Sequence, residues 1–411
     1  MADFYDTLET RHPDLRELHL FSGLREQLGH ARKRSPYFAR LLADIQPESV
    51  ADRQALAALP VTRKSALIES QRALPPFGGM TTVPVGDLGR VFQSPGPIYD
   101  PEAKRADYWR MARALYAAGF RRGNLAHNCF SYHFTPAGSM FESGAMAIGC
   151  AVFPAGVGNT ESQARAVADL RPDGYIGTPS FLKIILEKGR ELGLDCSSLT
   201  KGMVSGEALP PSLRAELKAM GVAVLQCYGT ADIGLIAYES ESVEGMIVDE
   251  GVILEIVRPG TGDPVSEGEV GEVLVTTLNP DYPLIRFATG DLSAVLPGRS
   301  PCGRTNMRIK GWMGRADQTT KVKGMFVHPE QVAEVVKRHP EISRARLVVT
   351  REGGNDAMTL KCETTGPTDG LAAKLAETMQ AVMKLKGRAE TVPAGGLPND
   401  GKVIEDARSY E

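Results

Sequence analysis

Residues 201–232 read K-G-M-V-S-G-E-A-L-P-P-S-L-R-A-E-L-K-A-M-G-V-A-V-L-Q-C-Y-G-T-A-D, and this stretch decides the fold class. An apolar β-prone run at 203–205 is followed by a helical stretch at 211–220 and by a second apolar run at 222–227. The same alternation occurs upstream, with strands expected at 151–154 and 174–177 and helices at 108–118, 160–170 and 180–192. Strands alternating with helices predict a mostly parallel α/β sheet covered by helices on both faces.

The sequence pattern differs on both sides of this region. The first sixty residues place apolar side chains at helical spacing, which predicts helices at 15–32 and 37–43. Downstream, β-type alternation at 251–258 and 271–278 predicts antiparallel strands, and a small α+β pattern follows, with strands at 321–326, 345–350 and 357–362 and helices at 329–338 and 368–384. We therefore predict a large α/β domain over 1–314, with a β-rich subdomain at about 245–299, and a small α+β domain over 315–411.

The bulk composition excludes several classes of protein. The 411 residues carry a formal net charge of -3, so no basic field is available for nucleic acid or an anionic membrane. Six cysteines are scattered without a C-x-x-C pair, which favours reduced thiols in the cytoplasm over a disulfide framework. Residues 1–19 have no apolar signal core, and no apolar run is long enough to span a bilayer.

Two segments have the composition of nucleotide-binding loops. Residues 93–99, Q-S-P-G-P-I-Y, follow a β-like run, and small residues such as Ser94 and Gly96 let backbone N–H groups point at a phosphate. A plain Pro-Gly turn explains the same letters. Residues 204–210, V-S-G-E-A-L-P, end an apolar strand, where ligands bind in open α/β sheets: Ser205 and Gly206 allow close approach, and Glu207 is suited to an amino-purine. The alternative is the start of a helix.

Two further segments offer groups for a base, a metal ion and a ribose. In Y-G-T-A-D, residues 228–232, Tyr228 presents a flat ring, Gly229 and Thr230 follow at a tight turn, and Asp232 is a hard oxygen ligand for magnesium. In R-F-A-T-G-D-L, residues 286–292, Asp291 can accept from both ribose hydroxyls. Either segment alone is also compatible with an ordinary turn.

A lysine near the C-terminus completes a possible reaction centre. Lys402 follows L-P-N-D at 397–400, a turn that presents the side chain outward. When a carboxylate attacks the α-phosphate of ATP, negative charge builds on the bridging and equatorial oxygens, and one mobile ammonium group would stabilise it. A solvated surface charge is the ordinary reading of such a residue.

Aromatic and small residues gather before an expected helix. Phe130, Tyr132, Phe134 and Phe141, with Gly138 between them, form a slot that suits an aryl ring. A hydrophobic core explains the same residues equally well.

The ordered motifs resemble those of the phenylacetate-CoA ligase family, within the adenylate-forming superfamily. The resemblance is carried by L-P-V-T-R-K at 59–64, Y-G-T-A-D at 228–232, T-G-D-L at 289–292, the segment 314–329 and G-K at 401–402. It covers nearly the whole chain. It implies a large N-terminal α/β domain with a β-rich subdomain and a small mobile C-terminal domain.

The resemblance also implies a reaction and a set of roles. ATP and an aryl acid would give an aryl-AMP, and coenzyme A would then give a thioester and AMP. Glu207 and Tyr228 would bind adenine, and Asp232 would bind Mg2+. Asp291 and Arg315 would hold the ribose, and Asp317 would be the hinge. Lys402 would be the adenylation lysine, and the loop 321–324, with Lys323 and Gly324, would line the CoA channel.

The chain departs from the family pattern in four places. The phosphate loop has Pro95 and Pro97 and lacks the usual Thr pair, and Ala231 precedes the magnesium-binding acid, which is the shorter Asp. Cysteine and histidine ligands of a structural zinc in some members correspond here to Ser240, Met246 or Ile247, and Ser300, so no zinc is expected. The turn before Lys402 is one residue shorter.

Three functional hypotheses remain open at this point. The first is an ATP-dependent aryl-acid:CoA ligase. The second is an adenylation enzyme that passes the aryl-AMP to a carrier protein or an amine. The third is a nucleotide and aryl-acid binding protein with impaired catalysis, which the altered phosphate loop would explain. The sequence does not identify the acid, and a homodimer is compatible with it.

Overall fold

A computed structural model describes residues 3–94, 97–316, 320–322, 325–352, 355–364 and 370–408. The chain divides into two compact units. Unit 1 comprises residues 1–254, 275–287 and 296–312, and unit 2 comprises residues 255–274, 288–295 and 313–411.

The helices begin mostly at capping residues or prolines. Ser35, for example, accepts a hydrogen bond from the Phe38 N–H and Pro36 takes the first helical position. The helices are η1 (Thr7–Thr10), α1 (Pro13–Arg34), α2 (Pro36–Leu41), η2 (Pro47–Ser49), α3 (Arg53–Ala57), α4 (Lys64–Ala73), η3 (Val85–Asp87), α5 (Met111–Ala117), α6 (Ala137–Ala147), α7 (Thr160–Leu170), α8 (Pro179–Glu191), α9 (Pro211–Ala219), α10 (Pro329–Lys337) and α11 (Leu371–Met383).

The main sheet of unit 1 has the order β14-β15-β10-β9-β8-β7-β6-β4-β5. Its strands are β4 (Leu125–Asn128), β5 (Ala151–Pro154), β6 (Gly174–Gly177), β7 (Lys201–Val204), β8 (Ala223–Thr230), β9 (Gly234–Tyr238), β10 (Met246–Val248), β14 (Val295–Leu296) and β15 (Arg308–Ile309). Strands β5, β4, β6, β7 and β8 pair in parallel, whereas β9, β10 and β15 extend the sheet antiparallel. The carboxyl ends of the five parallel strands therefore share one edge.

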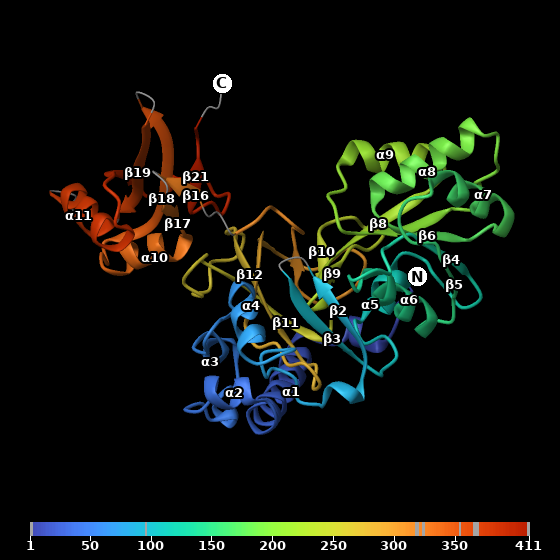
Figure 1. The fold of residues 1–411 in the computed structure, drawn as a ribbon, viewed down its shortest axis with the longest axis horizontal. Helices are drawn as coiled ribbons and strands as arrows, with labels where there is room; N and C mark the ends of the chain where they lie inside the picture. The colour runs from blue at the N-terminus through green and yellow to red at the C-terminus, as the bar shows by residue number, and fades with distance from the viewer. Residues whose placement is uncertain are drawn as a thin grey trace. The chain divides into compact units, whose positions relative to one another are not determined.

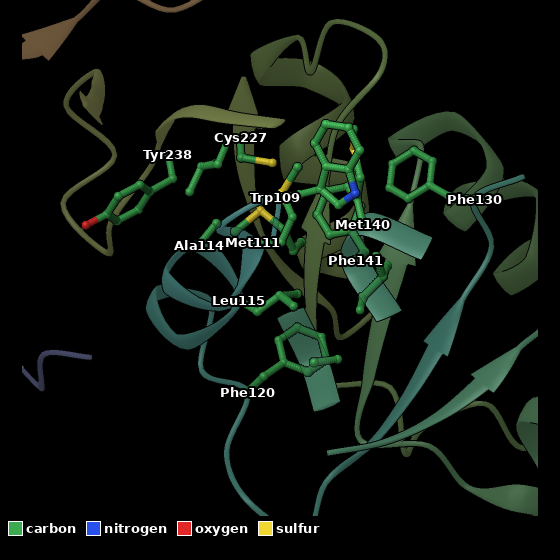
Figure 2. Close-up of a cluster of buried hydrophobic side chains, with 14 of the residues drawn as sticks. Trp109, Met111, Ala114, Leu115, Phe120, Phe130, Met140, Phe141, Cys227 and Tyr238 are labelled. Atoms are coloured by element: carbon green, nitrogen blue, oxygen red, sulfur yellow. The ribbon is translucent and has the colours of Figure 1, made fainter. Parts of the chain in front are cut away.

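Two hydrophobic cores cover opposite faces of the parallel part of this sheet. One core contains Ile176 and Met203 from the strands with residues of α5 and α6, and Figure 2 shows its central side chains. The other contains the neighbouring residues Tyr175 and Val204 with residues of α7, α8 and α9. Because successive strand residues point to opposite faces, α5 and α6 lie on one side and α7–α9 on the other (Figure 1).

Two smaller sheets involve the first half of the chain. Strands β2 (Leu88–Ser94) and β3 (Ile98–Ala103) form an antiparallel hairpin, in which Phe92 pairs with Asp100. A four-stranded sheet has the order β1-β13-β12-β11, with β1 (Thr62–Arg63), β11 (Val252–Val257), β12 (Gly271–Thr277) and β13 (Phe287–Ser293).

The C-terminal part of unit 2 is a small α+β fold with its own core. Its sheet has the order β20-β19-β18-β21, with β18 (Ile342–Glu352), β19 (Asn355–Thr364), β20 (Arg388–Pro393) and β21 (Ile404–Asp406). Helices α10 and α11 contribute Val332, Val335, Leu375 and Met379 to the core that this sheet buries. A short antiparallel pair, β16 (Thr320–Val322) and β17 (Met325–Val327), precedes α10.

The predicted fold class is confirmed: a large α/β part is accompanied by further β-structure and a small α+β part. The prediction of one strand over 321–326 is wrong. Lys321 pairs with Phe326 across an antiparallel hairpin, so the chain reverses between residues 322 and 325. Among the described residues, no helix combines the length and the apolar character needed to cross a bilayer.

Candidate functional site

The loop after β7 lies at the edge where the parallel strands end, which is where open α/β sheets bind ligands. Ser205 donates its hydroxyl to the Cys227 carbonyl at 2.8 Å, and this bond ties the loop to β8. Gly206 has φ +82°, a conformation that a side chain would strain. A Cβ on Gly206 would lie 3.6 Å from the Phe130 ring, so the loop and the aromatic cluster are neighbours.

Glu207 is anchored to a helix terminus. Its Oε1 accepts the Ser180 N–H at 2.6 Å, in the first turn of α8, where unsatisfied N–H groups favour a carboxylate. Glu207 therefore holds the loop after β7 against the start of α8, which begins with Pro179. The alternative reading, in which segment 204–210 starts a helix, also describes part of the structure, because α9 begins at Pro211.

The segment Tyr228–Asp232 ends β8 and turns into β9. Tyr228 is buried, with 7% of its surface exposed. A Cβ on Gly229 would lie 2.5 Å from the Gly234 carbonyl oxygen, so only glycine permits this close approach of the two strands. Thr230 accepts the Ile233 N–H at 3.3 Å and closes the turn that carries Asp232.

Asp232 lies in a buried charged cluster with two residues to which the sequence analysis gave no role. Lys64, at the start of α4, donates its Nζ to Asp232 Oδ2 at 2.6 Å. Asp100, on β3, lies so close that the charge of Asp232 raises the pKa of its carboxyl, in addition to the larger effect of burial. The sequence pattern could have pointed to Asp100, which directly follows Q-S-P-G-P-I-Y. Asp100 lies two residues after the buried Ile98 on the same strand, so both side chains point to the same face. Ser94, at the end of β2, is buried and donates its hydroxyl to the Ile98 carbonyl at 3.4 Å.

The aromatic cluster is divided between the core and the surface. Phe130 and Phe141 are stacked with ring centroids 4.8 Å apart and belong to the core in Figure 2. The Tyr132 hydroxyl accepts a hydrogen bond from Asn128 Nδ2 at 2.8 Å. Burial, and to a smaller extent the neighbouring Glu142 carboxylate, raises the pKa of Tyr132. Phe134 is 75% exposed and has φ +60°, an uncommon conformation for a bulky residue.

Gly138 is what lets the loop before α6 pack closely. A Cβ on Gly138 would lie 2.6 Å from the Ser131 carbonyl oxygen and 2.9 Å from the Tyr132 ring. The glycine therefore sets the position of Tyr132 against the start of α6.

Within unit 2, Asp291 and Arg315, the two residues to which the family resemblance assigns the ribose, lie in contact. Arg315 Nη1 donates to Asp291 Oδ1 at 2.9 Å, and the two residues also form a β-bridge. The Asp291 N–H donates to the Thr289 hydroxyl at 3.1 Å, and Gly290 has φ +73°, with the Arg315 guanidinium 2.7 Å from where its Cβ would be. A side chain at position 290 would thus displace the arginine.

Lys402 is exposed and lines a cavity of about 510 Å³ within unit 2, together with Arg258, Lys337 and Arg344. Its backbone N–H donates to Asp400 Oδ1 at 3.0 Å, which fixes the turn before it. Gly96, Asp317, Lys323 and Gly324 lie outside the described residues.

The residues at the positions that correspond to zinc ligands in some family members form a different kind of site. Cys302 is buried, with the Ser300 hydroxyl 3.1 Å and Arg304 Nη1 3.5 Å from its Sγ. Burial raises the pKa of the Cys302 thiol, but hydrogen bonds from Ser240, Ser300 and Arg304 outweigh it, and the net pKa is lowered. One cysteine sulfur beside hydroxyls and a guanidinium is not a zinc donor set. The described part of the chain contains no group of three or more acidic, cysteine or histidine side chains placed to hold a metal ion.

Comparison with known proteins identifies the fold. Residues 108–279 match the family model described as AMP-binding enzyme. The fold matches a crystal structure of 2-hydroxyisobutyryl-CoA ligase with 2-HIB-AMP and CoA in the thioesterification state, at a TM-score of 0.71, with 24% identity over 98% of this chain and 92% of that chain. An open conformation of the same ligase has a TM-score of 0.72, with 24% identity over 95% of this chain and 91% of that chain. The chain therefore has the fold of an adenylate-forming enzyme.

Sequence relatives then narrow the class to a family. Phenylacetate-coenzyme A ligase of Thermus thermophilus is 31% identical over 364 residues, covering 84% of this chain and 80% of the relative. The Escherichia coli enzyme of the same name is 30% identical over 377 residues, covering 87% of this chain and 84% of the relative. The chain belongs to the phenylacetate-CoA ligase family, and by homology it is an AMP-forming acid–CoA ligase.

Proposed function

We propose that this protein joins a small aromatic carboxylic acid to coenzyme A in two steps. In the first step, a carboxylate oxygen of the acid attacks the α-phosphorus of ATP, and pyrophosphate leaves to give the aryl-AMP. In the second step, the CoA sulfur attacks the acyl carbon, the thiol proton goes to solvent, and AMP leaves. The proposal places the reaction in the cytoplasm, in keeping with the six free thiols of the chain.

The aromatic substrate is inferred from the position of Phe130. This ring stacks on Phe141 and lies beside Gly206, in the loop where the parallel strands end. An acid bound next to these rings would bury an aryl group and present its carboxylate towards a nucleotide at the strand ends. Tyr132, Phe134 and Gly138 are the proposed neighbours of the same acid.

The proposed roles of the other residues follow the family resemblance. Tyr228, Gly229, Thr230 and the loop Ser205–Glu207 would bind the adenine and α-phosphate groups of ATP, with Glu207 held in place by the Ser180 N–H. Asp291 would accept from the ribose hydroxyls while Arg315 orients it. Lys402 would bring its ammonium to the α-phosphate during the first step, and the segment around Lys323 and Gly324 would line the CoA channel.

Asp232 fits a magnesium ligand. Its Oδ1 is buried and has no hydrogen-bond partner within the part of the chain that is described, and Mg2+ prefers carboxylate and phosphate oxygens. When bound, Mg2+ would neutralise charge on the phosphates of ATP. Ser94 and Gly96 would contribute to phosphate binding beside it.

The experiment measures CoA-thioester formation with a panel of acids at saturating MgATP. The panel contains phenylacetate, benzoate and hydroxylated benzoates, with 2-hydroxyisobutyrate and acetate as aliphatic comparators. We expect the highest kcat/KM with an aromatic acid and AMP release that requires CoA. Preference for an aliphatic acid would refute the aromatic substrate. Acid-dependent pyrophosphate exchange without thioester formation would instead favour transfer to a carrier protein or an amine.

A further inference from the structure

Asp100 and Asp232 form a pair of buried carboxylates that their neighbours neutralise only in part. Asp100 is 0% exposed, and its polar neighbours include the Ser94 hydroxyl, which donates to the Ile98 carbonyl, and the Asp232 carboxylate. By hydrogen-bond geometry, neither Asp100 oxygen is paired within the described residues. Asp232 is also buried, and Lys64 contacts only its Oδ2. Two carboxylates and one ammonium leave the cluster one negative charge in excess when both acids are ionised.

An ordinary structural role does not explain this arrangement. Buried polar groups in proteins are nearly always hydrogen-bonded, and a buried charge without a partner is costly. Asp100 is fully buried beside a second acid, and an apolar side chain at this position would avoid the cost. Residues that retain such a cost are commonly found where a ligand supplies the missing partner.

The backbone holds both acids in place before any ligand binds. The Gln71 side chain makes two hydrogen bonds of 2.8 Å to the backbone of Tyr99. Its Nε2 donates to the Tyr99 carbonyl, and its Oε1 accepts from the Tyr99 N–H. The next residue, Asp100, is therefore fixed in the β2–β3 hairpin. Asp232 is fixed by the β8–β9 turn, in which Gly229 approaches the Gly234 carbonyl.

A divalent cation is the partner that fits these groups. Mg2+ binds through one or two carboxylates, keeps several waters and takes its remaining ligands from substrate phosphates. The cluster offers three carboxylate oxygens without a hydrogen-bond partner in the described chain, Asp100 Oδ1 and Oδ2 and Asp232 Oδ1. The Lys64 side chain is 27% exposed, so the cluster borders on solvent at the lysine.

We propose that Asp100 is a second carboxylate ligand of the metal ion that Asp232 binds, and that the Lys64 ammonium neutralises Asp232 until the metal arrives. This inference rests on the proposed function, which supplies MgATP as the nucleotide. It gives the site a second acid in a protein whose metal-binding acid is the shorter Asp and whose phosphate loop lacks the usual Thr pair. The metal and the ammonium then compete for Asp232.

The test is direct measurement of Mn2+ binding, with free Mn2+ followed by electron paramagnetic resonance. Titrations use the full-length chain with and without α,β-methylene-ATP, which cannot be adenylated. We expect Asp100→Asn to weaken Mn2+ binding in the presence of the nucleotide by about 10-fold or more, as loss of a group at a metal site does. Asp87→Asn, an exposed acid preceding the same hairpin, should bind Mn2+ as the unaltered protein does.

A second variant tests the competition independently. Lys64→Met removes the ammonium, so it should tighten Mn2+ binding without nucleotide, and the double variant Lys64→Met/Asp100→Asn should lose that gain. Mn2+ affinity that is unchanged in a folded Asp100→Asn protein would overturn the proposal. If Asp100→Asn does not fold, Lys64→Met decides, and weaker or equal Mn2+ binding in that variant overturns it. Because Mn2+ binding is measured without an acid substrate, its outcome is separate from that of the thioester assay.

Discussion

Replacing Asp291 by Ala tests the nucleotide site, with the cost to folding measured alongside. The Asp291 carboxylate pairs with the Arg315 guanidinium at 2.9 Å; the aspartate side chain is 9% exposed and the arginine side chain 54%. Removing a buried hydrogen-bonding partner costs about 1–3 kcal/mol of the free energy of unfolding. The variant should therefore fold but be less stable than the unaltered protein by about that amount.

Its effect on ATP binding is measured separately, through KM. Hydrogen bonds to a charged group contribute about 1.5–3 kcal/mol each, so losing the carboxylate that accepts from the ribose should raise KM for ATP roughly 10- to 100-fold. Because the ribose is bound similarly before and during the reaction, kcat should change little.

The assay is acid-dependent ATP–pyrophosphate exchange at varied ATP concentration, with unfolding in urea as the stability control. Asp195→Ala serves as a matched control, because Asp195 also pairs with an arginine, Arg171, at 2.7 Å on the surface of unit 1. An unchanged KM for ATP in Asp291→Ala, or an equal rise in Asp195→Ala, would refute the ribose assignment.

Two further predictions concern stability. Gly144→Ala should destabilise the protein by about 1–3 kcal/mol, since its Cβ would lie 2.7 Å from the Met111 Cβ and 2.8 Å from the Ala112 nitrogen, where α5 and α6 meet. In α1, a Cβ added by Gly29→Ala would meet nothing within 4 Å, so this variant should be more stable than the unaltered protein by about 0.5–1 kcal/mol. Urea unfolding of Gly144→Ala and Gly29→Ala measures both changes in stability. Equal effects of the two substitutions would contradict the packing argument. Burial raises the pKa of Asp107 from an ordinary 3.8 to about 7. Between these two pH values the folded state binds more protons than the unfolded state, so the free energy of unfolding falls as the pH rises from 3.8 to about 7. The slope is at most about 1.4 kcal/mol per pH unit, less for a side chain partly open to water, and Asp107→Asn should flatten it; a parallel pH profile in that variant would show that Asp107 does not titrate there.

The elements that the sequence predicted best are those set by local pattern. Strands 151–154 and 174–177 and helix 160–170 occur with the predicted bounds, because their apolar spacing and flanking glycines or polar residues are local signals. The hairpin at 320–327 is not evident from the sequence, because β-prone residues on both sides of the Lys323–Gly324 pair look like one continuous strand. A glycine inside such a run is a signal for a break in the strand.

Contacts set by tertiary packing lay beyond the sequence. Lys64 and Asp232 are 168 positions apart, and nothing local to either residue predicts their ion pair. The bond from Ser180 to Glu207 likewise depends on how α8 packs beside the β7 loop. The pairing of Asp291 with Arg315 agrees with the family resemblance, whereas the roles of these residues and the domain limits 1–314 and 315–411 stay predictions.

We propose that this chain makes an acyl adenylate with the help of Lys402. The most direct test of this proposal is ATP–pyrophosphate exchange in the unaltered protein and in Lys402→Ala, with thioester formation from supplied aryl-AMP and CoA measured in both. Acid-dependent exchange should be present in the unaltered protein and reduced about 100-fold or more in the variant, while both convert supplied aryl-AMP at similar rates. Exchange that no acid stimulates, or that survives the loss of Lys402, would contradict the account.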